Sequence, residues 1–369
     1  MRLLLACGGS GGHISPAIAV ADKCSEEGGE VLFLGSRKEL ENEFLQNQNY
    51  KFKALSSAPL PRKFSTDLFK SIYNNFRAIF QARSVLKEFK PDVVLGTGSY
   101  ASGAPVIAAF WLGIPVAIHE QNSYPGLTNR LLARKADRVA ISYPRSEQYF
   151  TKAAGNKIHY TGNPVRSEII ALDRREARQK FDVPADSFVI IVMGGSQGAE
   201  NINKSMFLTY DKILDNNYYI FHITGKDHYE EILARAKREL TNEQRDRITF
   251  FAFCEEIEYL FSAADLFIGR AGATTLAEIT VCGLPAILIP YPHAVADHQE
   301  YNARELAKAG AAEIIKEKNL NSDGLVRAIE KLHKNDKFRE MSEASLSLGK
   351  PGATENLMSI LKVLAEGEK

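Results

Sequence analysis

The sequence alternates between short apolar runs and longer stretches in which apolar residues recur every three or four positions. Continuous apolar runs are typical of strands buried on both faces of a parallel sheet, and the intervening periodicity is typical of helices. We expect strands at residues 3–7, 30–34, 92–95, 115–119 and 138–141, and in the second half at residues 188–193, 219–224, 248–253, 266–269 and 286–290. This order predicts a doubly wound α/β architecture.

The opening of the chain is repeated near its middle. The first predicted strand ends in the glycine loop CGGSGGH (residues 7–13), and the sixth ends in MGGSQGA (residues 193–199). Two such openings predict two Rossmann-like domains with parallel sheets and an intervening cleft. We place the domains at residues 1–165 and 166–349.

The linker and the tail complete this organisation. Gly162 and Pro164 interrupt the pattern, so the linker is expected at residues 163–166. Residues 350–369 predict an amphipathic helix that packs back on the first domain. Its apolar face would be formed by Leu357, Ile360, Leu361 and Leu364.

Composition narrows the classes of partner. The chain has 369 residues, which suits two domains, and a formal net charge of +1, which gives no global attraction to nucleic acid. Its four cysteines show no metal-ligand spacing, so we expect no zinc site, and their scatter along a chain of this length suits a reducing compartment. No metal and no cofactor are expected. The apolar start is expected to be a buried strand and not a signal peptide. Since no run of about 18 apolar residues occurs, the protein is expected in the cytoplasm or on the cytoplasmic side of a membrane.

Both glycine loops are candidates to hold a diphosphate. A glycine turn before a helix brings backbone N–H groups and the positive end of the helix dipole close to a ligand. The alternative is a tight turn without a ligand, which one loop alone supports equally well. Neither loop ends in the GK[ST] of a P-loop, and the second strand ends in Leu34, Gly35 and Ser36 without the acidic residue that NAD requires. A third glycine stretch, residues 96–103, is expected to line the same cleft.

Two segments of the second half contain candidate ligands for ribose and sugar hydroxyl groups. In GRAGATTLAE (residues 269–278), the Glu278 carboxylate could accept hydrogen bonds from vicinal ribose hydroxyls. The alternative is a helix-capping glutamate with Thr274 or Thr275 as the cap. Asp297 and Gln299 could bind sugar hydroxyls, or Asp297 could cap a helix beside a solvated Gln299.

These pieces belong to a larger set of motifs in a fixed order. They are GGSGGHISPAIAVA (8–21), KPDVVLGTGSYASG (90–103), GIPVAIHEQNSYPGLTN (113–129), TGNPVR (161–166), GGSQGA (194–199), GRAGATTLAEI (269–279), GLPAILIPYP (283–292) and DHQEYNA (297–303). Together they resemble the N-acetylglucosaminyltransferase family that converts lipid I to lipid II in bacterial peptidoglycan synthesis. The resemblance implies the GT-B fold, with two facing Rossmann-like domains. It also implies a UDP-N-acetylglucosamine donor bound by the second domain and an undecaprenyl-linked lipid I acceptor met by the first.

The resemblance also assigns roles to residues. It implies inversion at the anomeric carbon and a β-(1→4) linkage to the muramoyl sugar without a metal. His13 is our candidate general base because imidazole titrates near neutral pH, and the alternative is that it only positions phosphate or acceptor. Glu120 and His119 are weaker candidates. The implied donor contacts are Ser10, Gly11, Gly12, Asn122, Arg166, Ser196, Cys254 (by its backbone, near the uracil), Ala273, Thr274, Thr275, Leu276, Ala277, Glu278 and Gln299.

A basic segment predicts the membrane contact. Residues 62–90 contain seven Lys or Arg and two acidic residues. A helical stripe within it is formed by Phe69, Ile72, Tyr73, Phe76, Ile79 and Phe80. Such a stripe usually packs in a core, but its basic flanks also suit an interfacial helix on anionic inner-leaflet lipid. We expect a peripheral protein on the cytoplasmic side of the inner membrane, with other cell-wall synthesis proteins as candidate partners.

Two other functions stay open from the sequence. A UDP-N-acetylglucosamine epimerase, or an enzyme with another acceptor, would share the nucleotide-binding half. A non-catalytic nucleotide-sugar sensor could dispense with His13 or Glu278, and this chain has both.

Overall fold

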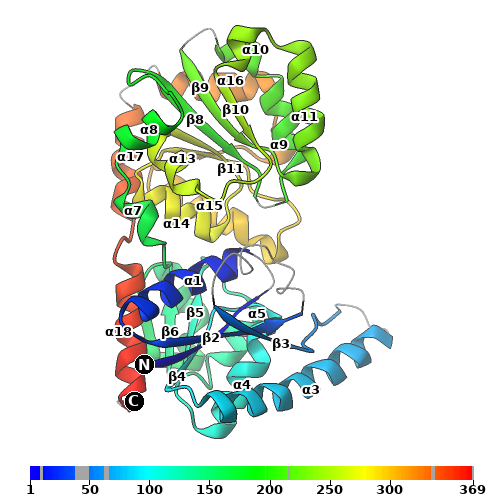
Figure 1. The fold of residues 1–369 in the computed structure, drawn as a ribbon, viewed down its shortest axis with the longest axis vertical. Coiled ribbons are helices and arrows are strands. Elements are labelled where there is room, and N and C mark those ends of the chain that lie inside the picture. The colour runs from blue at the N-terminus through cyan, green and yellow to red at the C-terminus, as the bar shows by residue number, and fades with distance from the viewer. Residues whose placement is uncertain are drawn as a thin grey trace. The chain divides into compact units, whose positions relative to one another are not determined.

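A computed structural model describes residues 1–8, 11–37, 50–61, 66–195, 197–214, 217–333 and 337–367 of the chain. It divides into two compact units (Figure 1). Unit 1 comprises Met1–Arg166 together with Lys350–Lys369, and unit 2 comprises Ser167–Gly349.

Unit 1 is built on a parallel sheet with the strand order β3-β2-β1-β4-β5-β6-β7. The strands are β1 (Arg2–Ala6), β2 (Glu30–Ser36), β3 (Lys51–Leu55), β4 (Val93–Gly96), β5 (Val116–Glu120), β6 (Arg138–Ile141) and β7 (Ile158–Tyr160). The central strands β1 and β4 are fully or almost fully buried, as their continuous apolar runs predict.

Helices cover both faces of this sheet. The α-helices of unit 1 are α1 (Gly11–Glu26), α3 (Thr66–Phe89), α4 (Gly103–Leu112), α5 (Leu127–Leu132), α6 (Thr151–Ala154) and α18 (Ala353–Ala365). On one face, α1 lies beside α18 (red in Figure 1), and Leu357, Leu361 and Leu364 are buried in the core that α1 shares with β1. On the other face, α3 packs on α4. The hydrophobic tail helix therefore completes the core of unit 1.

Unit 2 repeats the design with the strand order β10-β9-β8-β11-β12-β13, again parallel. Its strands are β8 (Phe188–Met193), β9 (Tyr218–Ile223), β10 (Ile248–Phe251), β11 (Leu266–Gly269), β12 (Ala286–Leu288) and β13 (Ala312–Ile314). Its α-helices are α7 (Ser167–Ala171), α8 (Arg174–Lys180), α9 (Glu200–Phe207), α10 (Tyr210–Ile213), α11 (Lys226–Glu239), α12 (Asn242–Arg245), α13 (Ile257–Ala263), α14 (Ala273–Val281), α15 (His298–Lys308), α16 (Ser322–His333) and α17 (Lys337–Leu348).

The ten expected strands are all present, with ends shifted by at most a few residues. The sequence did not predict β3, β7 and β13, which lie on or near sheet edges. β3 reads KFKAL and has one fully buried residue, while β7 and β13 have three residues each. Short, half-exposed edge strands lack the continuous apolar run on which the prediction depends.

Within the described residues, no helix is both long and apolar enough to cross a membrane.

Candidate functional site

The sheet order of each unit marks a place for a ligand. In unit 1, β1 and β4 are neighbours, and the chain continues outward from them in opposite directions. In unit 2, β8 and β11 stand in the same relation. Loops that leave the carboxyl ends of such a pair diverge, and ligands of open α/β sheets bind in the opening they leave. The loops at these four strand ends are those that carry the glycine motifs.

His13 lies at this point of unit 1. It is the third residue of α1, after the exposed Gly11 and Gly12. Its Nδ1 lies 2.9 Å from the Thr97 carbonyl oxygen and 3.1 Å from Gln121 Oε1. Because a carbonyl oxygen can only accept, Nδ1 must carry the proton, and Nε2 is the basic nitrogen. Nε2 makes no hydrogen bond to any residue that the structure describes.

Gly98 makes room for this imidazole. It follows Thr97 and has φ +97°, a conformation that favours glycine. A Cβ atom there would lie 3.2 Å from two atoms of the His13 ring and 3.2 Å from Asn129 Nδ2. The third glycine stretch thus contributes close packing around His13.

Glu120 organises the loop that carries Asn122. Its carboxylate is buried and accepts four N–H groups: Asn122 N at 2.9 Å and Nδ2 at 3.1 Å on Oε1, Gly126 N at 3.0 Å and Asn129 Nδ2 at 2.9 Å on Oε2. With two donors on each oxygen, this carboxylate is arranged to hold its loop and not to take a proton from a substrate. His119 is also buried, and burial lowers its pKa to about 4.

Arg166 is the last residue of the first segment of unit 1 and is half-buried. Val165 before it is held by α18, because Thr354 Oγ1 donates to its carbonyl oxygen at 3.1 Å.

The start of α14 is the clearest anion-binding end in unit 2. It follows β11, has Gly272 as its N-cap with no side-chain cap, and carries no acidic residue in its first turn. Its first N–H groups and dipole therefore favour an anion. The expected contacts Ala273, Thr274, Thr275, Leu276, Ala277 and Glu278 are its first six residues.

Glu278 lies in the second turn of α14 and is buried. A capping glutamate occupies the third helical position, so the capping alternative for Glu278 is wrong. Its role as a ribose ligand stays a prediction.

Gln299 joins two loops at the carboxyl ends of β11 and β12. Its Oε1 accepts from Tyr291 N at 3.0 Å and from Ala271 N at 3.3 Å. The carboxamide oxygen is thus occupied by the protein, and only Nε2 is available to a sugar.

Ala296 and Asp297, just before α15, both have φ +53°, and Asp297 occupies the N-cap without a side-chain cap. Two adjacent left-handed residues store strain in this loop, as functional loops often do.

Arg270 holds the same loops and was not assigned a role from the sequence. Its guanidinium pairs with Glu317 at 2.5 Å and donates to the Ile289 carbonyl oxygen at 3.1 Å. Burial opposes ionisation of Glu317, but hydrogen bonds from Arg270 and Asn201 outweigh it and keep its pKa below the usual value. The sequence signal that could have identified Arg270 is its position directly after a buried strand.

The remaining expected residues are placed as follows. Cys254 follows the edge strand β10 and is half-buried, and burial raises the pKa of its thiol to about 11. Ser10 and Ser196 lie outside the described residues. In the second glycine loop, a Cβ at Gly198 would lie 2.2 Å from the Thr224 carbonyl oxygen, so this glycine is needed for packing against the loop after β9.

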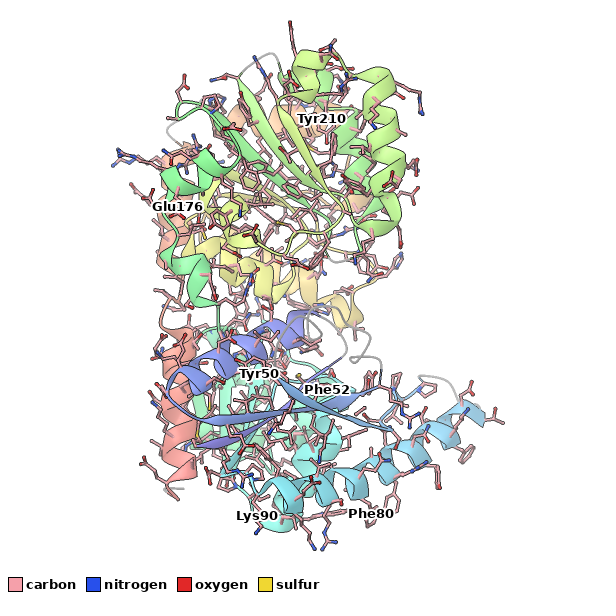
Figure 2. All side chains as sticks on the ribbon, viewed as in Figure 1. Tyr50, Phe52, Phe80, Lys90, Glu176 and Tyr210 are labelled. Atoms are coloured by element: carbon pink, nitrogen blue, oxygen red, sulfur yellow. The ribbon has the colours of Figure 1, made fainter. Side chains whose placement is uncertain are left out.

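The stripe on α3 faces solvent. Its exposed members are Phe69 (70%), Ile72 (51%), Tyr73 (66%), Phe76 (57%) and Phe80 (49%). The core-packing alternative is wrong for these five, because α3 buries Ser71, Ala78, Ala82, Leu86 and Phe89 instead. Figure 2 shows Phe80 on the outer side of α3.

The aromatic surface continues onto α4. The Phe80 ring packs against Phe76 with centroids 5.0 Å apart, and lies 6.4 Å from the ring of Trp111, which is 52% exposed. Lys135 Nζ lies 4.4 Å from the Phe110 ring, and Lys70, Arg77 and Arg83 are exposed along α3. Exposed aromatic residues are thus interleaved with basic side chains.

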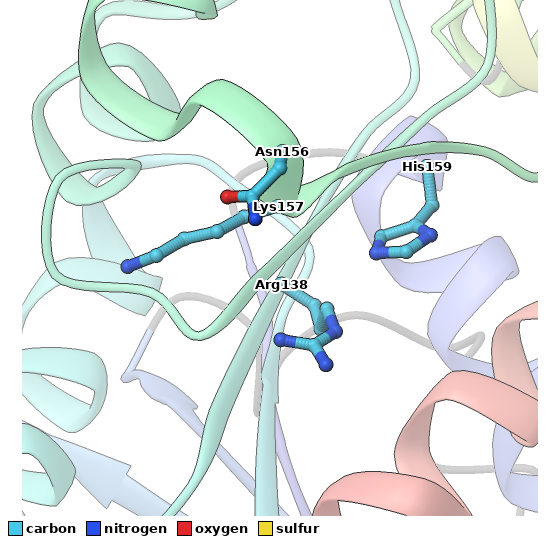
Figure 3. Close-up of a pocket in the computed structure, with 4 residues that line it drawn as sticks. All are labelled: Arg138, Asn156, Lys157 and His159. Carbon is cyan, nitrogen blue, oxygen red and sulfur yellow. The ribbon is translucent and has the colours of Figure 1, made fainter. Parts of the chain in front are cut away.

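A separate cavity of about 290 Å³ lies at the amino ends of β6 and β7. It is lined by Arg138, Asn156, Lys157 and His159 (Figure 3). Burial lowers the pKa of His159, and the nearby Arg138 lowers it further. None of the residues expected from the sequence lines this cavity, because those residues follow the carboxyl ends of the strands. Elsewhere in the described part of the chain, no group of three His, Cys, Asp or Glu residues is placed to hold a metal ion.

Family comparisons match both units. The glycosyltransferase family 28 N-terminal domain matches residues 3–141, and the family 28 C-terminal domain matches residues 189–357. Two relatives are named UDP-N-acetylglucosamine--N-acetylmuramyl-(pentapeptide) pyrophosphoryl-undecaprenol N-acetylglucosamine transferase. The one from Halothermothrix orenii is 42% identical and the one from Bacillus licheniformis 36%, each with 100% of both chains covered.

Solved structures agree on the fold. The crystal structure of Acinetobacter baumannii MurG has a TM-score of 0.74 at 29% identity and covers 98% of this chain and 99% of that chain. Os79 from O. sativa in complex with UDP has a TM-score of 0.73 at 13% identity with 100% of both chains covered, which bears on the fold alone. The expected fold class, α/β of GT-B type with two Rossmann-like domains and parallel sheets, is confirmed.

Proposed function

We propose that this chain, which belongs to glycosyltransferase family 28, transfers N-acetylglucosamine from UDP-N-acetylglucosamine to lipid I. The relatives that it matches over their full length are named as N-acetylglucosamine transferases. The product is lipid II, the disaccharide precursor of peptidoglycan. The observation that carries this proposal is identity of 36–42% over essentially the whole length of relatives that share one name.

The donor half of the reaction is assigned to unit 2. The N-terminal N–H groups of α14 receive the diphosphate, the buried Glu278 receives the ribose hydroxyls, and Gln299 Nε2 faces the sugar. This assignment is supported by the uncapped start of α14 and by the occupied Oε1 of Gln299. A dipole and preorganised N–H groups stabilise the departing UDP without a metal ion. Arg166 adds a cation for the same charge.

The acceptor half is assigned to unit 1. The C4 hydroxyl of the muramoyl sugar attacks C1 of N-acetylglucosamine from the face opposite UDP, so the configuration inverts. Its proton passes to His13 Nε2, its oxygen forms the new bond to C1, and the bond from C1 to the diphosphate oxygen breaks with its electron pair on UDP. Support comes from the Nδ1–H tautomer of His13, which leaves Nε2 to accept.

The decisive assay is acceptor-dependent release of UDP with a lipid I analogue. Turnover of UDP-N-acetylglucosamine should require the analogue and should yield a β-(1→4) disaccharide. Conversion of the donor sugar in the absence of acceptor would show that the protein is an epimerase and not a transferase. Binding of the donor without turnover in the presence of acceptor would show that it is a nucleotide-sugar sensor.

We infer that the α3 stripe attaches the protein to an anionic membrane surface. The support is the set of five apolar side chains that are about half exposed or more, beside exposed Lys70, Arg77 and Arg83. Burying a phenylalanine in an apolar phase is worth roughly 1.5–3 kcal/mol. The proposed peripheral location on the cytoplasmic side of the membrane is consistent with the proposed acceptor, because lipid I is held in the membrane.

Vesicle binding tests this inference. The wild-type protein should bind vesicles that contain phosphatidylglycerol, and added salt should weaken the binding. Phe76→Ser with Phe80→Ser should reduce vesicle partitioning at least tenfold and leave turnover of a water-soluble acceptor unchanged. Leu208→Ser with Leu346→Ser is the matched control, since both leucines are 55% exposed in unit 2. Equal partitioning of the two double variants would contradict the assignment of the stripe.

A further inference from the structure

A line of hydrogen bonds connects the backbone carbonyl of Gly162, near the end of the first segment of unit 1, to the imidazole of His13. His119 Nε2 lies 3.1 Å from the Gly162 carbonyl oxygen. Gln121 Nε2 lies 3.1 Å from His119 Nδ1 and 2.7 Å from the Thr97 carbonyl oxygen. Gln121 Oε1 in turn lies 3.1 Å from His13 Nδ1.

Each proton in this line has one possible place. The Thr97 carbonyl can only accept, so Gln121 must direct its NH₂ group toward Thr97 and toward His119 Nδ1, which leaves its oxygen for His13. His119 therefore accepts on Nδ1 and carries its proton on Nε2, which lies 3.1 Å from the Gly162 carbonyl oxygen and 3.2 Å from Ser142 Oγ. An oxygen can only accept, so His13 must donate from Nδ1.

Burial protects the arrangement from water. His119 is 0% exposed and Gln121 is 1% exposed, so solvent cannot replace their hydrogen bonds. Burial lowers the pKa of His119 to about 4, and the nearby His13 also disfavours a second positive charge. His119 is thus neutral at neutral pH.

We propose that Gln121 and His119 are positioning residues that hold the His13 proton on Nδ1 and direct Nε2 to the acceptor hydroxyl. This inference rests on the proposed role of His13 as general base. When Nε2 takes the acceptor proton, the charge that forms on the imidazolium is stabilised by two oxygens at Nδ1, from Gln121 and Thr97. Because the Gln121 side chain is neutral, it stabilises the imidazolium of His13 less than a carboxylate would, and the imidazolium can still release its proton.

The resting tautomer is measured by ¹⁵N NMR of imidazole nitrogens in the full-length protein. His13 should give the Nδ1–H pattern and His119 the Nε2–H pattern, and His119 should stay neutral from pH 8 down to pH 6. An Nε2–H tautomer of His13 overturns the proposal, whatever the activity of any variant.

Two substitutions of Gln121 should move the pH profile of turnover in opposite directions. In Gln121→Glu, a carboxylate beside Nδ1 stabilises the imidazolium, so the acid limb should move to higher pH by roughly one to three units. In Gln121→Leu, one acceptor of the imidazolium is lost, so the limb should move to lower pH and turnover at neutral pH should fall roughly 10- to 100-fold. The exposed Gln148, changed to Glu or Leu, serves as the matched control in the same unit and should leave the limb in place.

The outcomes distinguish failure of the positioning role of Gln121 and His119 from failure of the base role of His13. Loss of activity in both Gln121 variants with an unmoved acid limb overturns the positioning role, because a merely structural residue would behave in that way. Full activity of His13→Gln with the acid limb retained overturns the base role itself, and the positioning role with it. The expected Nδ1–H tautomer with opposite limb shifts supports both.

Discussion

Replacing Glu120 by glutamine tests whether this carboxylate holds the loop around Asn122. The change is close to isosteric, and it exchanges one carboxylate oxygen for an NH₂ group. Each oxygen of Glu120 accepts two N–H groups, at 2.9 and 3.1 Å on Oε1 and at 3.0 and 2.9 Å on Oε2. Whichever way the amide turns, its NH₂ group faces two donors and two hydrogen bonds are lost.

The magnitude follows from this count. A hydrogen bond to a charged group contributes roughly 1.5–3 kcal/mol, so two lost bonds correspond to roughly 3–6 kcal/mol. The neutral amide is cheaper to bury than the carboxylate, which offsets part of the loss. We therefore expect the free energy of unfolding of Glu120→Gln to fall by about 3 kcal/mol, at the lower end of that range.

Urea unfolding followed by circular dichroism measures the difference. The exposed Glu147, changed to Gln in the same unit, is the control and should shift the free energy of unfolding by about 0.5 kcal/mol or less. A loss below about 1 kcal/mol for Glu120→Gln would show that the four contacts do not stabilise the loop. Glu120 would then return as a candidate base in place of His13.

Three further changes probe the site and the core. Glu278→Ala should weaken the binding of UDP and of UDP-N-acetylglucosamine alike, by roughly 1.5–3 kcal/mol in calorimetry, and unchanged UDP affinity in a folded variant would exclude the ribose contact. Gly98→Ala should reduce turnover more than donor affinity, because its Cβ at φ +97° presses on the His13 ring at 3.2 Å. Unfolding free energy should decline as the pH falls from 6.5 toward 4, because the unfolded chain binds protons at His119 and at His222, a buried residue of β9, that the folded chain, with pKa values of about 4 and about 3, does not. Each histidine contributes at most about 1.4 kcal/mol per pH unit, and a flat profile in urea melts over this range would contradict the buried, neutral state of both.

The sequence by itself determined the architecture, because the signals for it are local. Continuous apolar runs such as those of β1 and β8 fit only strands buried on both faces, and glycine loops after them fit strand-to-helix turns at the ligand end of a parallel sheet. The motif order identified the family resemblance for the same reason, since it can be followed along the chain without knowledge of contacts. The domain limits and the roles of the donor-binding residues were also set out from the sequence, and they stay predictions.

Only the tertiary structure decided which polar groups meet. His13, Thr97, Gln121 and Gly162 are far apart in the chain, and they come together because β1, β4 and β5 are neighbours in one sheet while Gly162 follows the adjacent β6 and β7. The periodicity of the α3 stripe showed an apolar face but not what covers it, since a core and a membrane surface select the same side chains. The position of Glu278 as a helix cap or a buried second-turn residue likewise depended on where α14 begins, and the structure places the N-cap of α14 at Gly272. Hydrogen-bond partners and exposure depend on long-range contacts, and the pattern along one chain does not contain them.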